Sequence, residues 1–155
     1  MFRPETAMYK HVLIATDGSE LSQKAEVTGL TLAKDFGAQA TAVTVTEPWD
    51  ALTMAALAER GMSNPVLNYD ERMRALANKI LSRVSEIAKS LGTPCITVHV
   101  KDRRPADGII EYAKAHACDL IVIASHGHSG ITSVLLGSQA IKVLMLSDVP
   151  VLVCR

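Results

Sequence analysis

The hydrophobic pattern of this chain changes its period repeatedly, from short apolar runs to helical spacing and back again. Apolar, β-branched runs predict five strands, at residues 10–16, 39–46, 95–100, 119–124 and 149–154. Between them, apolar residues recur every three or four positions and predict helices, at 21–36, 70–91, from Pro105 onward and at 138–147. Strands that alternate with helices predict one parallel sheet with helices on both faces.

Three parts of this pattern carry further expectations. Residues 49–69 have no sustained period, so we expect an irregular connection with a short helix at 51–60 and Asp70 as the cap of the next helix. The run at 95–100 alternates apolar and polar residues, which is typical of a sheet edge. The run at 119–124 is the most apolar, and we expect it at the centre of the sheet.

The length and charge of the chain narrow the function classes. With 155 residues we expect a single domain over 1–155, with a flexible tail at 1–8. Lys and Arg number 16, as do Asp and Glu, so the chain lacks the basic footprint of a nucleic-acid-binding protein or a polybasic membrane anchor. No apolar run approaches the roughly 18 residues of a membrane span. The three cysteines, an odd and widely spaced set, favour a reduced thiol state, and we expect a cytoplasmic protein without nucleic-acid or membrane partners.

The sheet topology predicts where a ligand would bind. In an open parallel sheet, ligands lie beyond the carboxyl ends of the strands, where the strand order reverses. The segments that follow the first, second and fourth strands are Thr16 to Ser19, Val45 to Glu47, and Ala124 to Gly130. We expect the first and fourth strands to be neighbours at that point, so the first and third of these segments should meet.

The longest of these segments is rich in glycine. Residues 124–138 read ASHGHSGITSVLLGS, with glycines at Gly127, Gly130 and Gly137, and Gly137 and Ser138 open a helix. A helix N-terminus offers unpaired N–H groups and a positive dipole end, which suit a phosphate. The alternative is a glycine loop that only permits a tight strand-to-helix turn, and the residues leave both interpretations open. The Walker and dinucleotide-binding motifs are absent.

Four segments of the chain together resemble the universal stress protein family: the TDGSE turn, the IVIASHG run, the LLGS segment and the terminal PVLV strand. Its nucleotide-binding members are similar to one another in the pattern G-x-x-G-x9-G-S/T. Gly127 matches the second glycine, His128 to Leu136 are the nine spacers, and Gly137 and Ser138 close the pattern. Ala124 takes the place of the first glycine. The resemblance implies a five-stranded parallel sheet of strand order 3-2-1-4-5, as in adenine nucleotide alpha-hydrolase-like folds.

The resemblance also implies a function. The protein would be a stress-response module that binds ATP or AMP, with or without Mg²⁺. Asp17 would accept hydrogen bonds from the ribose, Val45 would offer backbone groups to the adenine, and Gly127, Gly137 and Ser138 would hold the phosphates. The rest of the implied site is Ala15, Thr16, Ile123, Ala124, Ser125, His126, Gly130 and Gln139. No catalytic residue is implied, and we expect at most slow ATP hydrolysis.

Competing interpretations stand beside these roles. Asp17 could cap the first helix together with Ser19. His126 and His128 could be two metal ligands, although no cysteine or carboxylate lies near them in the sequence. A positive φ at Ala124 would be strained and would weaken binding. A family member that binds no nucleotide would act only through its dimer or partner surface.

The last predicted strand carries an expectation about assembly. It is short, apolar and terminal, so we expect it at a sheet edge. Exposed edges of this kind are an aggregation liability unless they are covered. We therefore expect a homodimer through Val149 to Arg155, paired antiparallel about a two-fold axis, as the resemblance also implies.

Overall fold

A five-stranded parallel sheet forms the centre of the computed structural model, which describes residues 8–127 and 135–155. Its strands are β1 (His11–Ala15), β2 (Gln39–Val45), β3 (Cys95–Val100), β4 (Leu120–Ala124) and β5 (Val151–Cys154). Their order across the sheet is β3-β2-β1-β4-β5, which confirms the predicted order 3-2-1-4-5 and the edge positions of β3 and β5. β4 is buried throughout as predicted, but β1 is the middle strand. Of the tail predicted at 1–8, only Met8 is among the described residues.

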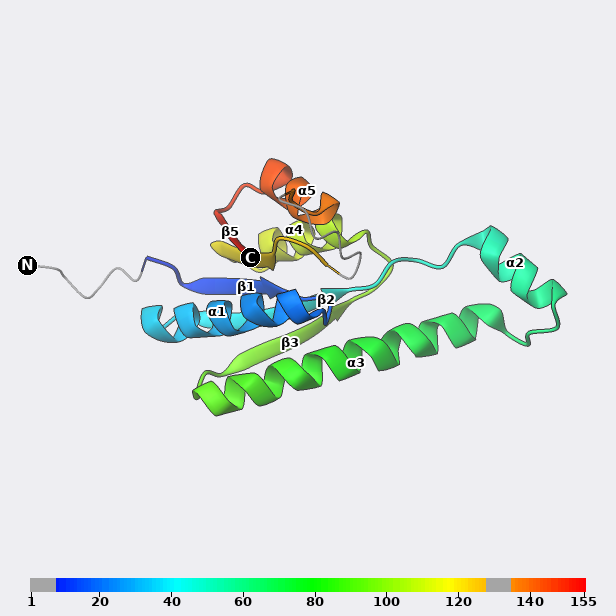
Figure 1. Cartoon of the computed structure of the whole chain (residues 1–155), viewed down its shortest axis with the longest axis horizontal. Helices are drawn as coiled ribbons and strands as arrows, with labels where there is room; N and C mark the ends of the chain where they lie inside the picture. The colour runs from blue at the N-terminus through cyan, green and yellow to red at the C-terminus, as the bar shows by residue number, and fades with distance from the viewer. Residues whose placement is uncertain (1–7, 128–134) are drawn as a thin grey trace, which may run out of the picture.

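The described chain has five helices, and four of them cover the two faces of the sheet. They are α1 (Glu20–Phe36), α2 (Ala51–Glu59), α3 (Pro65–Leu91), α4 (Pro105–Ala115) and α5 (Ser138–Leu146). Figure 1 shows α4 and α5 on one side of the sheet and α1 and α3 on the other. Ser19 caps α1 by accepting the N–H of Ser22 at 3.1 Å. The three-layer arrangement follows because each crossover between parallel strands carries a helix over one face.

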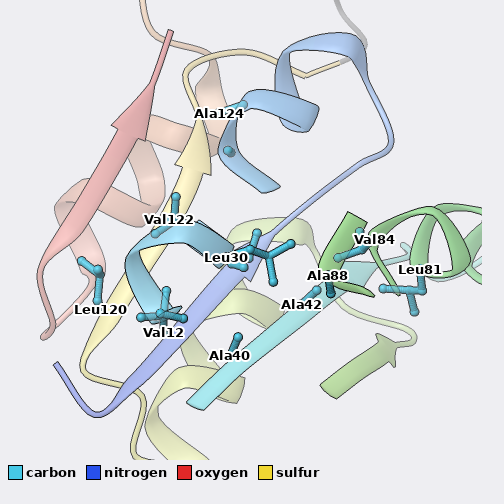
Figure 2. Close-up of a cluster of buried hydrophobic side chains, with 13 residues drawn as sticks. Val12, Leu30, Ala40, Ala42, Leu81, Val84, Ala88, Leu120, Val122 and Ala124 are labelled. Carbon is cyan, nitrogen blue, oxygen red and sulfur yellow. The ribbon is translucent and has the colours of Figure 1, made fainter. Parts of the chain in front are cut away.

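The sheet separates two hydrophobic cores. Beneath α1 and α3, strand side chains such as Val12 and Val122 pack against Leu30 and Val84 (Figure 2). On the other face, Leu13 and its alternate neighbours pack against α4 and α5. Both faces are therefore enclosed, which explains why the inner strands have continuous apolar runs. Full burial of one such leucine or valine contributes roughly 1.5–3 kcal/mol.

The prediction for residues 49–69 was wrong in part. The short helix α2 is present, and Asp50 caps it by accepting the N–H of Thr53 at 2.8 Å. However, α3 begins at Pro65 instead of after Asp70, with Asn64 as its cap in the left-handed region. A proline is favourable in a first helical turn because its φ is already set. The 27 residues of α3 span about 40 Å. Its first turns project from the sheet together with α2 (Figure 1). They therefore need no apolar face, and the sequence at the start of this helix shows no helical pattern of apolar residues.

Candidate functional site

A cavity of about 500 Å³ opens at the carboxyl ends of β1, β2 and β4, beside the first turns of α4 and α5. It lies at the predicted switch point, since β1 pairs with β2 on one side and with β4 on the other. The predicted site residues that line it are Ala15, Thr16, Asp17, Val45, Ile123, Ala124, Ser125, His126, Gly127, Gly137, Ser138 and Gln139. Gly130 and His128 lie outside the described residues.

Further residues that the sequence analysis did not include also line this cavity: Ser22, Val43, Pro105, Ile109 and Ala140. Glu47, from the predicted segment Val45 to Glu47, lines it as well. Val43 could have been found, because it shares a strand face with Val45 two positions later. Pro105 and Ile109 could not, because they reach the cavity only through the packing of α4 on β2. That packing is close at Gly108, where a β carbon would lie 2.8 Å from Cγ1 of Val45.

Asp17 supports the turn that joins β1 to α1. Its Oδ1 accepts the N–H of Ser19 at 2.9 Å, while Ser19 itself is the N-cap of α1. Its Oδ2 faces Gly127, where a β carbon would overlap this oxygen. Ser19 is therefore the cap of α1, and Asp17 supports that capping residue from the preceding turn. The same side chain also lines the cavity.

Gly137 also lines the cavity and is the N-cap of α5. Its N–H donates to the carbonyl of Ser125 at 2.7 Å, and a β carbon on it would lie 3.0 Å from that same oxygen. This N–H is therefore already used within the chain. The N–H groups that follow it, from Ser138 to Ala140, occupy the first turn of α5, where a helix has no acceptor of its own.

Gln139 connects the two helices beside the cavity. Its Oε1 accepts the N–H of Ala106 in the first turn of α4 at 3.1 Å. Ala106 is 1% exposed, so without this bond its N–H would be buried without an acceptor. The side chain predicted to line the site thus also fixes α4 relative to α5.

His126 also lines this cavity. Its Nδ1 lies 2.9 Å from Oγ of Ser125. Its Nε2 is buried and has no hydrogen-bond partner within the described ranges 8–127 and 135–155. A buried nitrogen without a partner lowers stability, so this atom is a polar group that the described residues leave unsatisfied.

The model of the universal stress protein family matches residues 8–155. The chain belongs to this family. The universal stress protein YxiE of Bacillus subtilis is 32% identical to it over 151 residues, which cover 96% of this chain and 100% of YxiE.

Two further relatives support the family assignment. The universal stress protein MJ0531 of Methanocaldococcus jannaschii is 30% identical over 148 residues, which cover 96% of this chain and 83% of MJ0531. A solved structure of a universal stress protein in complex with cAMP matches with a TM-score of 0.68 and 25% identity, over 94% of this chain and 95% of that one.

In this universal stress protein, the alanine at the first glycine position of the motif is accommodated without strain. Ala124 is the last residue of β4 and is 6% exposed. It is not among the described non-glycine residues with a positive φ, which are Asn64, Asp102 and Ala117. The expected strain at Ala124 is therefore not observed, and its methyl group packs into the core beneath α1 and α3.

Two other expectations concern metal binding and membrane insertion. Within residues 8–127 and 135–155, no group of three or more His, Cys, Asp or Glu side chains could hold a metal ion. Of the two histidines considered as metal ligands, His126 lines the cavity and His128 lies outside those ranges. None of the helices in the described chain is long and apolar enough to cross a membrane.

Proposed function

We propose that this universal stress protein binds an adenine nucleotide, ATP or AMP, in the cavity at the strand ends and acts as a nucleotide-dependent stress-response module. The observation that carries the proposal is the composition of this one cavity. It combines apolar walls, a carboxylate from Asp17 and the first turn of α5. Its volume of about 500 Å³ lies within the 300–1,000 Å³ range of small-molecule sites. The complex of a related protein with cAMP supports the same conclusion.

The apolar part of the cavity would hold the adenine. Val43 and Val45 come from β2, and Pro105 and Ile109 come from α4, so the base would lie between a strand end and a helix. Ala15 and Ile123 are further apolar members of the site. The backbone of Val45 would provide the hydrogen bonds that the polar rim of the base requires.

The polar part would hold the ribose and phosphates. Asp17 would accept hydrogen bonds from the ribose hydroxyls, and Ser138 with the N–H groups after Gly137 would bind the phosphates. His126 would line the same pocket. Gly127 and Gly137 would contribute by having no side chain, because a β carbon at either position would crowd Asp17 or Ser125 beside the ligand. Gly130 remains a predicted member of the site.

Mg²⁺ would arrive with the phosphates of ATP. The described cavity contributes two carboxylates, Asp17 and Glu47, and hydroxyl groups that include Thr16 and Ser125. Oxygen donors of these kinds are the ligands that Mg²⁺ accepts beside phosphate. We assign no catalytic residue here and expect at most slow ATP hydrolysis.

Extraction of the purified protein with acid, followed by chromatography, would test the proposal directly. We expect an adenine nucleotide to be released. Calorimetric titration of the emptied protein with ATP, AMP and GTP should then show binding of the adenine ligands and little binding of GTP. Absence of binding by any nucleotide would favour the alternative, a family member that acts only through its dimer or partner surface.

We further propose that two copies pair through the C-terminal strand, within the predicted segment Val149 to Arg155. The carbonyls of Pro150 and Cys154 accept N–H groups from β4, so alternation turns the N–H and C=O groups of Val151 and Val153 to the open side. Antiparallel pairing about a two-fold axis would satisfy these groups. Exposed apolar side chains on α5, such as Met145 at 77% exposure, are consistent with an interface on this side of the molecule.

The location of the protein in the cytoplasm remains a prediction.

A further inference from the structure

Glu26 is a carboxylate with no exposure to solvent, on the inner face of α1. Its Oε1 accepts hydrogen bonds from Oγ1 of Thr16 and from Nη2 of Arg83, a residue of α3. Burial of a charged group lowers stability unless the group is well paired. Thr16 lines the cavity, so this ion pair, in which Glu26 is buried and Arg83 is half-buried, is bonded to a residue of the candidate site.

The same arginine reaches the turn that carries Asp17. Its Nη1 donates to the carbonyl of Gly18 at 3.1 Å, and the N–H of Gly18 lies 3.2 Å from Oγ1 of Thr16, which accepts it. Helix α3 also packs directly onto this turn, since a β carbon on Gly18 would lie 2.7 Å from Cγ1 of Ile80 in that helix. Asp17 is therefore held between two residues that Arg83 and Glu26 fix in place.

We propose that Arg83 and Glu26 are positioning residues that set the orientation of the Asp17 carboxylate in the cavity. Neither side chain lines the cavity, so both act through the turn at residues 16–18. The planar guanidinium of Arg83 bonds two acceptors at once, the carbonyl of Gly18 and the carboxylate of Glu26, which a lysine ammonium does not reproduce. The part of this inference that concerns a ligand rests on the proposed function.

Two variants separate this role from simple stabilisation. Arg83→Lys keeps a positive charge beside Glu26 and loses the fork that reaches Gly18. The double variant Glu26→Gln/Arg83→Met removes both charges, so no unpaired charge stays buried if the lysine variant folds poorly. Arg74→Lys is the matched control, because Arg74 is an exposed arginine on the same helix.

The first measurement compares the Kd of ATP with that of 2′,3′-dideoxy-ATP, which lacks the hydroxyls that Asp17 would bind. In the wild type we expect ATP to bind roughly tenfold more tightly, the equivalent of one hydrogen bond to a charged group. In Arg83→Lys this ratio should fall to about twofold while the Kd of the dideoxy ligand is unchanged. Arg74→Lys should keep the wild-type ratio. An unchanged ratio in Arg83→Lys, or an equal loss for both ligands, would overturn the inference.

The second measurement needs no nucleotide. Amide hydrogen exchange followed by NMR should be at least about tenfold faster at Gly18 and Ser19 in Arg83→Lys, because local opening of the turn becomes easier, while the β1 amides stay protected. If the wild type binds no nucleotide, the proposed function fails, and the exchange rates alone decide this inference. Unchanged exchange at Gly18 and Ser19 would then reject it.

Discussion

No β carbon fits between residue 127 and the carboxylate of Asp17, because it would overlap Oδ2 of that side chain. The two residues follow β4 and β1, which are paired neighbours in the sheet. Glycine at position 127 therefore lets the two strand ends meet closely enough to share one cavity.

The substitution Gly127→Ala should weaken ATP binding. The added methyl group displaces the carboxylate that would bind the ribose, and loss of one charge-assisted hydrogen bond corresponds to roughly ten- to hundredfold in Kd. Calorimetric titration measures this change. In an Asp17→Ala background the same substitution should cause little additional loss, and a full additional loss would contradict the displacement mechanism.

Substitutions at Asp17 should separate ligand binding from support of the turn. Asp17→Asn keeps an acceptor for the N–H of Ser19 but loses the charge, whereas Asp17→Ala loses both. We expect both variants to bind ATP more weakly, and only the alanine variant to lose about 1 kcal/mol of unfolding free energy. If Asp17→Ala is less stable yet binds ATP as the wild type does, the residue serves the turn alone.

Gln139→Ala should lower the stability of the fold. It leaves the buried N–H of Ala106 without an acceptor, which costs about 1–3 kcal/mol. Urea denaturation measures the loss. Gln139→Glu keeps an acceptor oxygen at the first turn of α4 and should lose less, so equal losses in the two variants would argue against this hydrogen bond as the cause.

Val153→Pro should convert the proposed dimer to a monomer. Proline removes the outward N–H of an edge strand and leaves the ladder to β4 intact. Val153→Ala is the control, since it shortens the same side chain but keeps the N–H. Sedimentation velocity should show a monomer only for the proline variant, and an intact dimer in both would exclude β5 as the interface.

The free energy of unfolding should fall as the pH rises from about 9 to 11. Burial raises the pKa of the Cys95 thiol from 9.0 to about 11, and burial with the nearby Asp119 charge does the same for Cys118. Over this range the unfolded chain has lost thiol protons that the folded chain retains, so rising pH favours unfolding. A Cys95→Val/Cys118→Val variant should show a shallower decline by urea denaturation at each pH. An identical decline would contradict this cause.

The fold and the place of the site could be predicted because they depend on local patterns. Alternating periods predict parallel strands, and ligands of such sheets bind at the switch point, so Asp17 and His126 could be brought to one cavity from the sequence. Contacts between distant helices left no such pattern. Glu26 shows this most clearly, since its charge on the inner face of α1 is paired with Arg83, which lies 57 positions away in the sequence.

Other details depended on backbone hydrogen bonds that a sequence does not display. Gly137 was predicted to hold phosphate, yet its N–H bonds to the carbonyl of Ser125. The start of α3 was also missed, since its first turns project beyond the sheet and need no apolar face (Figure 1).

The projecting α2 has a consequence for how such a chain can evolve. Met54 is the buried residue of this helix, and Figure 1 shows α2 far from the strand ends that form the cavity. Dense packing restricts substitution only where side chains are enclosed. The segment between Glu47 and Pro65, which contains α2, should therefore tolerate insertions, deletions and changes of composition. It can diverge between descendants while the cavity stays the same.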